Sequence, residues 1–408
     1  MTRSPTVLVV GGGATGAGVA RDLARRGIDV ALVDRGGLGS GTSGRSHGLL
    51  HSGARYAESD PVGAEECIEE NHVIREIAGE CVRDTGGLFV ELAADDPAYF
   101  DAKRAACEDV GIPTTVLDAA AVRERVPDIA PDVERAMAVP DGVVYPSRLV
   151  AANAAAVEAN GGTVHPHAPL EALTVEDGRV LAATIGGRVD ATFEPAFVVN
   201  AAGAWAGDVA AMAGVDVEMA PARGAMVAVD HGALGPVLNR CREPEDGDIV
   251  LPHADEVVLG TTSVPVDDPD EYERADWERA RCVEECAAML PAVADAEVTR
   301  TWWGVRPLYA PDEADTDRRG ISRGFFALDH ADDGVANLAS VVGGKLTTYR
   351  RMAEATADLV ADHLGVDEPS TTADATLPGA DDPDRLDAFA DRYDARNPSD
   401  ANLYDAAR

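Results

Sequence analysis

Two histidines and an arginine follow one another at four-residue intervals near the start of the chain: His47, His51 and Arg55. An imidazole, with a pKa of about 6.5, can accept a proton at neutral pH. A guanidinium binds carboxylate or phosphate through paired hydrogen bonds. If this stretch is helical, the three side chains share one face. Gly48 and Gly53 weaken that helix, so a tight irregular turn is the alternative. Either arrangement gathers an acid–base group and an anion-binding group.

Two later segments also carry a cation in a setting suited to anion binding. In residues 302–308 Arg306 lies between two tryptophans and a proline, and in residues 343–350 Lys345 follows a glycine pair. Lys345 is one of only two lysines, beside Lys103, in a chain that otherwise uses arginine. We expect residues 343–350 to end a strand and open a helix, whose N-terminus favours negative charge. Structural alternatives stay open: an ion pair for Arg306, an ordinary capped helix, and surface or capping histidines.

The N-terminal segment predicts the element that positions these groups. Residues 6–10 are apolar strand formers, Gly11, Gly13 and Gly16 follow, residues 17–26 read as a helix, and a second strand ends in Asp34. Gly11 permits the tight turn, Gly13 lets backbone approach a pyrophosphate, and Gly16 allows close packing of helix on strand. Asp34 lies 18 residues after Gly16, where a ribose-binding carboxylate is expected. The pattern predicts a dinucleotide site.

The distribution of strands favours FAD over NAD as that dinucleotide. Asp34 is followed by a Gly- and Ser-rich loop over residues 36–44 rather than by a further strand–helix repeat. Strands expected from about residues 6, 197 and 339 each end in a Gly-containing turn. One nucleotide domain can be assembled from all three, with a second domain inserted between them. Further helices are expected at residues 61–106 (interrupted by a strand at 87–92), 118–126, 146–160, 276–290 and 345–364, and strands at 136–144, 163–189, 220–229, 249–262 and 298–308.

Composition sets the broad class. The chain has 408 residues, 46% of them hydrophobic, enough for two domains or one composite domain. Its 72 acidic and 35 basic residues give a net charge of −37, spread along the whole chain. Nucleic acid is therefore disfavoured as a partner. We interpret the charge as adaptation to molar salt. There the Debye length is about 3 Å, so an anionic substrate needs direct contacts in a local basic pocket.

No apolar run approaches the ~18 residues of a membrane span, and the N-terminus leads directly into a strand without a signal peptide. We therefore expect a cytoplasmic protein whose membrane contact, if any, is peripheral, on the inner face of the membrane. The six cysteines form no C-x-x-C pair, and we predict buried thiols and no metal site, with a redox or metal role for Cys282 and Cys286 as the alternative.

Taken together, these motifs resemble the glycerol-3-phosphate dehydrogenase family of flavoproteins, within the D-amino-acid-oxidase-like superfamily. The resemblance spans residues 6–365 and rests on the N-terminal fingerprint and on residues 42–56, 223–224, 260–262, 303–307 and 343–350 in order. Residues 47–56 are most similar to the A subunit of the anaerobic, multi-subunit type. That subunit usually carries a Cys-rich C-terminal domain, which this sequence does not contain, so the electron exit route stays open.

The resemblance implies an α/β fold: a Rossmann-like FAD-binding domain of the glutathione-reductase type with an inserted α+β substrate domain built on an antiparallel sheet. We expect the FAD-binding domain in residues 1–70, 145–215 and 320–365, the substrate domain in 71–144 and 216–319, and a C-terminal extension, as part of a further domain, in 366–408.

The resemblance also implies oxidation of sn-glycerol 3-phosphate to dihydroxyacetone phosphate, with hydride transfer from C2 to FAD N5 and electrons passed to partner subunits or a quinone. His51 and Arg306 would be catalytic, with Arg55, Tyr56, Arg306 and Lys345 binding substrate. The alternatives are an FAD-dependent oxidase or dehydrogenase of an amino acid, secondary amine or 2-hydroxy acid, and a non-catalytic FAD-binding docking subunit. The expected FAD-binding residues are Gly11, Gly13, Ala14, Thr15, Gly16, Asp34, Arg35, Thr42, Ser43, Ser46, His47, Gly48, Leu49, Ala202, Gly203, Trp205, Gly344, Lys345, Leu346 and Thr347.

Overall fold

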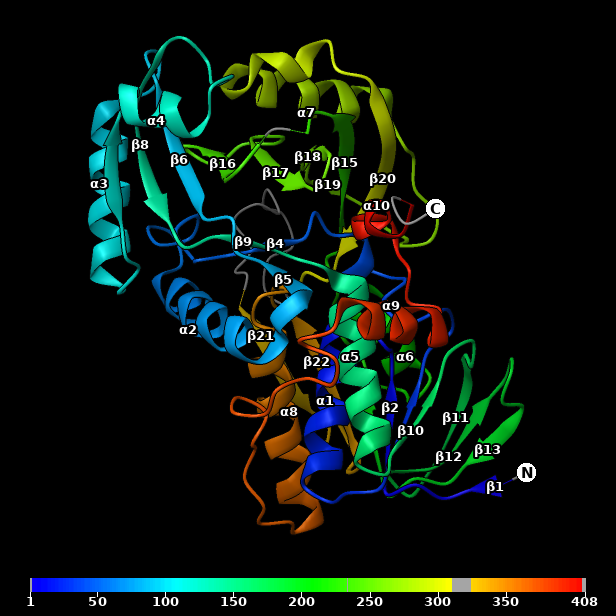
Figure 1. Ribbon diagram of the computed structural model, residues 1–408. Coiled ribbons are helices and arrows are strands. Elements are labelled where there is room, and N and C mark those ends of the chain that lie inside the picture. Colours follow the sequence, from blue (N-terminus) through cyan, green and yellow to red (C-terminus); the bar gives the residue numbers. More distant parts are fainter. Residues whose placement is uncertain (1, 233, 310–323, 406–408) are drawn as a thin grey trace.

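The computed structural model describes residues 2–232, 234–309 and 324–405 of the chain. Two sheets dominate it (Figure 1). A mostly parallel sheet with flanking helices fills the lower half of the view, and a large antiparallel sheet with α3, α4 and α7 fills the upper half. The chain passes between the two halves several times, so each sheet collects strands from distant parts of the sequence.

The parallel sheet contains the predicted nucleotide unit. Within the described residues its strand order is β10-β3-β2-β14-β22-β21, parallel except for β21, which runs antiparallel to β22. Every residue of β2, β3 and β14 is buried, as expected for parallel strands covered on both faces. The strands are β2 (Val7–Val10), β3 (Val30–Val33), β10 (Thr163–His165), β14 (Phe197–Asn200), β21 (Phe325–Asp329) and β22 (Leu338–Gly343).

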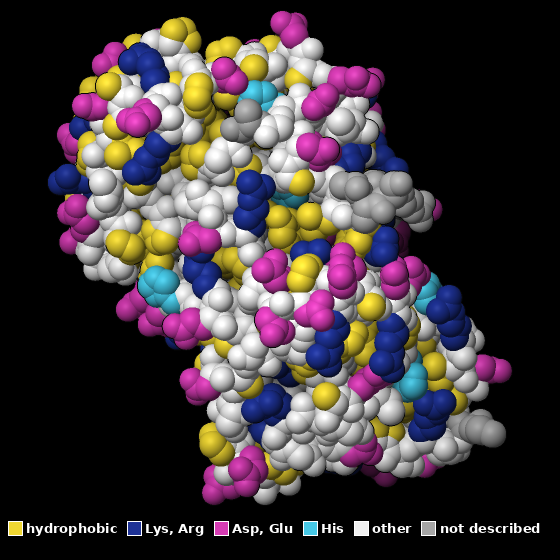
Figure 2. Space-filling view, viewed as in Figure 1, with side chains coloured by type: hydrophobic (Ala, Val, Ile, Leu, Met, Phe, Trp, Pro, Cys, Tyr) yellow, Lys and Arg dark blue, Asp and Glu magenta, His cyan; other side chains and the backbone are white. Residues whose placement is uncertain are grey.

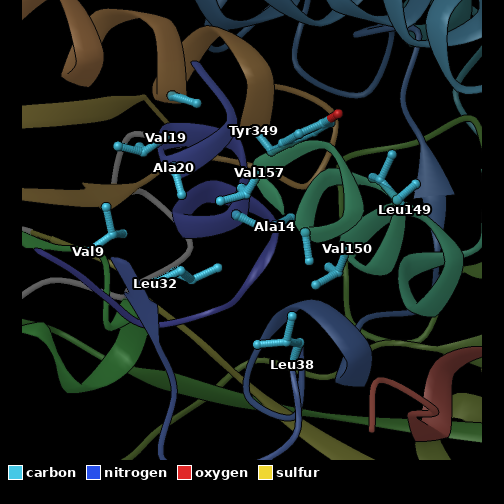
Figure 3. Close-up of a cluster of buried hydrophobic side chains, with 14 of the residues drawn as sticks. Val9, Ala14, Val19, Ala20, Leu32, Leu38, Leu149, Val150, Val157 and Tyr349 are labelled. Carbon is cyan, nitrogen blue, oxygen red and sulfur yellow. The ribbon is translucent and has the colours of Figure 1, made fainter. Parts of the chain in front are cut away.

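Alternate side chains of β2 enter different cores. Val7 and Val9 pack against three helices, α1 (Ala14–Arg25), α5 (Pro146–Ala159) and α8 (Tyr349–Leu364). Figure 3 shows this core, with Val19 and Ala20 of α1, Val150 and Val157 of α5, and Tyr349 of α8 around one another. Leu8 and Val10 instead pack toward a small sheet of order β1-β13-β12-β11 and toward α6 (Ala206–Ala211). The small-sheet strands are β1 (Thr2–Arg3), β11 (Leu170–Glu176), β12 (Arg179–Ile185) and β13 (Ala191–Phe193).

The large sheet covers the carboxyl ends of the parallel strands. Its described strands run in the order β19-β15-β18-β17-β16-β6-β8-β7, with β20 also paired to β15, and all pairs are antiparallel except β16 with β6. Its core packs against α4 (Ala119–Arg125) and α7 (Asp276–Met289). The strands are β6 (Gly87–Leu92), β7 (Thr115–Asp118), β8 (Val133–Val139), β15 (Ala222–Asp230), β16 (Val237–Arg240), β17 (Ile249–His253), β18 (Glu256–Gly260), β19 (Val264–Pro265) and β20 (Val298–Arg306).

The connecting region carries the short strands β4 (Leu49–Leu50), β5 (Val82–Arg83) and β9 (Gly142–Val144), and the helices α2 (Pro61–Ala78) and α3 (Pro97–Asp109). Asp60 caps α2 by accepting a hydrogen bond from Gly63 N at 3.0 Å. The capped helix begins directly after residues 51–60, which carry several of the predicted site residues.

The structure decides between two predictions for residues 47–55 and corrects the predicted start of a later helix. The stretch from His47 to Arg55 is not helical: β4 and turns occupy it, as the irregular alternative required. The helix expected from Lys345 begins at Tyr349 instead. Residues 345–348 form a turn instead, in which Thr348 N donates to Lys345 O at 3.1 Å and Lys345 N donates to Thr348 Oγ1 at 3.2 Å. Lys345 therefore lies in the turn before α8 rather than in its first turn.

The predicted domain boundaries can be placed relative to the helices and cores of the described residues. The one at residues 70–71 lies inside α2, whose Ala64 and Ile68 pack beside Phe100 while Ile74 packs in the core of the parallel sheet. The one at residues 319–320 lies outside the described residues. Residues of the expected C-terminal extension, including Leu386 of α9 (Pro383–Arg392), pack into the same core as α1 and α5, and α10 (Asn402–Asp405) follows. The last three residues of that extension are not described.

The six cysteines are all buried thiols. Cys286 Sγ donates to Gly247 O at 2.9 Å, and burial raises the pKa of Cys67 and Cys241 to about 12. No trio of His, Cys, Asp or Glu side chains in the described parts of the chain is arranged to hold a metal ion. None of the described helices combines the length and apolarity needed to cross a bilayer.

Candidate active site

A cavity of about 810 Å³ lies between the parallel sheet and the large sheet. It opens at the carboxyl ends of β2, β3 and β22, where open α/β sheets bind their ligands. The described residues bring most of the predicted site to it. The predicted residues that line it are Gly11, Gly13, Ala14, Thr15, Gly16, Asp34, Arg35, Thr42, Ser43, Ser46, His47, Leu49, His51, Arg55, Tyr56, Ala202, Gly203, Trp205, Arg306, Gly344, Lys345 and Leu346.

The glycines of the first turn have little room for a side chain. A Cβ on Gly11 would lie 2.4 Å from Ala201 O, and one on Gly16 would lie 1.8 Å from Gly11 O. Gly16 therefore sets the close approach of α1 to β2. Gly13 lines the cavity at the start of α1, and a Cβ there would come within 3.2 Å of Ser43 Oγ. The turn thus presents bare backbone to the cavity, which is what a pyrophosphate requires.

The carboxylate of Asp34 is fixed by backbone N–H groups. Gly12 N donates to Oδ2 at 2.6 Å and Gly36 N donates to Oδ1 at 2.8 Å. Burial raises the pKa of Asp34, and these two hydrogen bonds oppose the rise. Each oxygen keeps a further lone pair that can accept from a ribose hydroxyl.

Hydroxyl groups of residues 42–46 bind this loop to both the parallel sheet's helix α1 and the large sheet. Ser43 Oγ accepts from Ala14 N at 2.9 Å, which binds the loop to the start of α1. Thr42 Oγ1 donates to Val305 O at 2.7 Å, which binds it to β20 of the large sheet. Ser46 Oγ donates back to Ser43 O. The loop therefore couples the nucleotide turn to the strand that carries Arg306.

A segment with charged side chains, which we call the strap, covers the cavity beside Asp34. Arg35 pairs with Asp270 through two hydrogen bonds of 2.9 and 2.6 Å, and its guanidinium lies 4.2 Å from the Trp205 ring centroid. Trp205 Nε1 also donates to Asp270 Oδ2 at 3.0 Å. The hydrogen bonds from Arg35 lower the pKa of Asp270, and this effect outweighs the rise caused by partial burial. Asp270 belongs to residues 266–275, which connect β19 to α7 over this end of the cavity.

His51 is held from both sides of its peptide backbone. Its N–H donates to Thr347 Oγ1 at 3.0 Å, and its carbonyl accepts from Asn71 Nδ2 at 3.0 Å. The residue is 8% exposed and lines the cavity. Its ring centroid is 5.2 Å from that of Tyr56 and 6.1 Å from that of His47. The buried imidazole is thus placed by its backbone and aromatic neighbours.

His47 serves the same turn in a different way. Its Nδ1 accepts from Leu49 N at 3.1 Å, so the neutral ring carries its proton on Nε2. His47 O in turn contacts Nε2 of the buried His253 at 3.2 Å. Gly48, at φ +80°, does not line the cavity; it turns the chain between these contacts, and a Cβ would lie 2.8 Å from Val144 O. Thr347 likewise lies behind the cavity wall and supports His51.

The three predicted cations have different partners. Lys345 Nζ lies 3.9 Å from Asp60 Oδ2 and 4.6 Å from the Tyr56 ring centroid. Arg55 Nη2 forms a 2.6 Å ion pair with the buried Asp248. Burial lowers the pKa of Arg55, but Asp248 outweighs it and the net direction is upward.

Arg306 contacts three oxygen atoms of neighbouring strands and turns. Its Nη2 donates to Thr262 O at 2.9 Å and Thr261 Oγ1 at 3.3 Å, and its Nη1 contacts Arg223 O at 3.5 Å. These contacts hold the guanidinium at the end of β20, on the cavity wall.

Sequence reasoning missed part of the lining. Glu245 and Asp246 line the cavity and come from a loop with no recognisable motif. Asp248, in the same loop, lies behind the lining as the partner of Arg55. Thr261 lies in a run that carried the resemblance, and that run was the available signal. Arg45 and Arg274 also line the cavity; Arg45 is inside the Thr42–Ser46 run, whereas nothing local distinguishes Arg274 from other surface arginines.

The chain belongs to the family of FAD-dependent oxidoreductases, whose sequence model matches residues 6–359. FAD is therefore its cofactor, and the bare turn, the fixed carboxylate of Asp34 and the start of α1 fit that dinucleotide. The sequence is 47% identical over 413 residues to the A1 subunit of the anaerobic glycerol-3-phosphate dehydrogenase of Haloferax volcanii, covering 98% of this chain and 70% of that protein. It is 40% identical over 393 residues to the A subunit of the anaerobic glycerol-3-phosphate dehydrogenase of Escherichia coli, covering 94% of this chain and 71% of that one.

A solved structure gives the same fold. The glycerol-3-phosphate dehydrogenase from Bacillus halodurans, complexed with FAD, superposes with a TM-score of 0.72 at 26% identity, covering 93% of this chain and 68% of that one. The predicted fold class and cofactor are thus confirmed. The acid-rich composition fits the Haloferax relative, and Figure 2 shows Asp and Glu side chains scattered over both halves of one face among arginines.

Proposed function

We propose that this chain oxidises sn-glycerol 3-phosphate to dihydroxyacetone phosphate. The observation that carries the proposal is a single cavity lined by the β2–α1 turn at one end and by His51, Arg306 and Lys345 at the other. The names of the two relatives reported above support the choice of substrate. Bound FAD would supply the acceptor for the hydride from C2, at N5.

The phosphate group would be bound by Arg306 and Lys345. A phosphate carries a charge of about −1.5 to −2 at neutral pH, so it needs more than one cation in so acidic a protein. The contacts of Arg306 with Thr261, Thr262 and Arg223 O orient its guanidinium on the cavity wall. Asp248 engages one nitrogen of Arg55, so Arg55 would contribute through its other N–H groups. Tyr56 would complete the pocket by packing between Lys345 and His51.

His51 would act as the base that accepts the C2 hydroxyl proton. Its backbone is fixed by Thr347 and Asn71, so the imidazole enters the reaction already oriented. Its low exposure keeps bulk water away from the proton transfer. Positioned acid–base groups of this kind contribute about 10²- to 10⁴-fold to rate.

We further propose that electrons leave through partner subunits toward a quinone, on the inner face of the membrane. The supporting observation is that the similar Haloferax and Escherichia proteins are each named as one subunit of an anaerobic enzyme. The predicted division into an FAD-binding domain and a substrate domain is part of the same proposal.

The test is turnover of the purified flavoprotein with an artificial electron acceptor in molar salt. Glycerol 3-phosphate is compared with glycine, sarcosine and 2-hydroxyglutarate. We expect turnover with glycerol 3-phosphate, a large loss in Arg306→Leu, and partial recovery in Arg306→Lys. Arg279→Leu, at a partly exposed arginine of α7 outside the cavity, is the matched control. Turnover with an amine or 2-hydroxy acid alone would replace the substrate; no turnover with any of them would favour a docking subunit.

A further inference from the structure

A second, smaller cavity adjoins the first. Its volume is about 310 Å³, and it is lined by Arg45, Arg274, Arg300, Thr301 and Trp302, among others. Arg45 and Arg274 line both cavities. We call this smaller cavity the arginine pocket. None of the described residues that line it is acidic, in a chain with 72 acidic residues.

Two of these arginines are not committed to carboxylates. Arginines elsewhere in the molecule are, as in the pairs Arg35–Asp270 and Arg55–Asp248. Among the described residues, no carboxylate oxygen lies within 4.0 Å of the Arg45 or Arg274 guanidinium. Arg45 Nε donates to Ser40 O at 2.9 Å, a neutral acceptor. Two uncompensated positive charges therefore border one pocket.

Arg300 and Trp302 form another part of the pocket wall. Arg300 pairs with Glu256, donates to Pro398 O, and lies 4.6 Å from the Trp302 ring centroid. Its charge is compensated, so it shapes the wall rather than supplying free charge. Trp302 is buried, and its Nε1 has no hydrogen-bond partner among the described residues. Buried donors of this kind are commonly satisfied by water or by a bound acceptor.

We propose that the arginine pocket binds a small multivalent oxyanion, one that bears phosphate or carboxylate groups. Guanidinium groups match the paired oxygens of both. The pocket is larger than a halide requires, and the ligand would be held by direct contact with Arg45 and Arg274. Direct contact is the condition for binding at ~1 M salt, where charges are screened beyond about 3 Å. This pocket is separate from the phosphate-binding group of Arg306 and Lys345, so it does not depend on the proposed function.

The experiment follows thermal unfolding of the holoenzyme while potassium phosphate replaces chloride at constant ionic strength, with citrate in a parallel series. We expect a saturating rise in the unfolding midpoint. Arg274→Gln should remove most of the rise without unfolding the protein, because Arg274 is exposed. Arg279→Gln removes the same charge from a partly exposed site on α7, outside the arginine pocket, and should keep the rise. Arg306→Leu should keep the part of the rise that comes from the arginine pocket and lose only the part that comes from phosphate bound in the main cavity.

The two series identify the ligand class: a larger effect of phosphate supports a phosphorylated ligand, and a larger effect of citrate supports a carboxylate. Four results would overturn the proposal. They are no rise beyond chloride, loss of the rise in Arg306→Leu but not in Arg274→Gln, equal loss in Arg274→Gln and Arg279→Gln, or loss of bound FAD from Arg274→Gln with the phosphate response intact. The last would assign Arg274 to the flavin alone.

Discussion

The end of the main cavity that we propose for FAD is lined mostly by backbone, and the end that we propose for substrate is lined by side chains. Residues 11–16 and Asp34 lie within one short stretch and form their site through a turn, a helix start and two N–H···O bonds. His51, Arg306 and Lys345 come from three separate segments and meet only because two sheets face each other. The first end should therefore tolerate almost no change in shape, and the second should tolerate changes that spare the fold but not the chemistry.

The largest effect is expected from Gly16→Ala. The added Cβ would lie 1.8 Å from Gly11 O and 3.1 Å from Ala201 Cβ, so α1 and β2 would have to separate. We expect protein without bound FAD, or no folded protein. The measurement is the flavin-to-protein absorbance ratio after purification. Gly235→Ala, where a Cβ meets no atom within 4 Å, is the control. Normal flavin content in Gly16→Ala would contradict the close packing described here.

The second prediction concerns the substrate end. His51→Asn should lower kcat roughly 10²- to 10⁴-fold, the range for loss of a general base, while FAD stays bound. Steady-state kinetics and the flavin spectrum of the same preparation measure both quantities. His72→Asn, at an exposed histidine of α2, should change neither. If kcat is unchanged in His51→Asn, another group accepts the proton.

The same contrast explains what could be predicted from sequence. The turn glycines and Asp34 act through neighbours in the chain, so their spacing was sufficient. The contact of Lys345 with Tyr56 joins positions far apart in sequence, and only the resemblance indicated it. Asp248 was missed because an ion pair across two loops leaves no periodic signal. The start of α8 was placed four residues too early because the turn over residues 345–348, closed by a hydrogen bond from Thr348 N to Lys345 O, has no distinctive sequence pattern.

The third prediction is a pH dependence of stability. His253 is fully buried. Burial is the main cause that lowers its pKa to about 4, and the positive charge of Arg300 lowers it further. The unfolded imidazole takes up a proton near pH 6.5, so the folded state loses stability as pH falls from about 6.5 to about 4, by roughly 3 kcal/mol in total. Above pH 6.5 this contribution does not change.

Urea unfolding at pH 7.5 and pH 5 in high salt measures this loss. His253→Gln should show a smaller loss between the two pH values than the parent chain. His72→Gln should show the parent's full loss. Parallel pH profiles for the parent and His253→Gln would mean that this histidine does not titrate as described.

The smallest effect is expected from the strap. Asp270→Asn breaks the ion pair with Arg35, but both side chains are about half exposed, with fractions of 51% and 52%. Such pairs contribute about 0–1 kcal/mol, so the FAD dissociation constant should rise by no more than about 5-fold. Flavin fluorescence during dilution measures it. Asp276→Asn, which breaks an exposed pair on α7, should leave FAD affinity unchanged. Complete loss of FAD from Asp270→Asn would make the strap a main determinant of cofactor binding.

The proposed oxidation requires that one cavity hold FAD and glycerol 3-phosphate together. The direct test is the visible absorption spectrum of the purified holoprotein, recorded without oxygen before and after glycerol 3-phosphate is added. We predict that the oxidised flavin band bleaches in the parent chain and persists in Arg306→Leu. A flavin band that persists in the parent chain, with FAD bound and substrate in excess, would contradict the account.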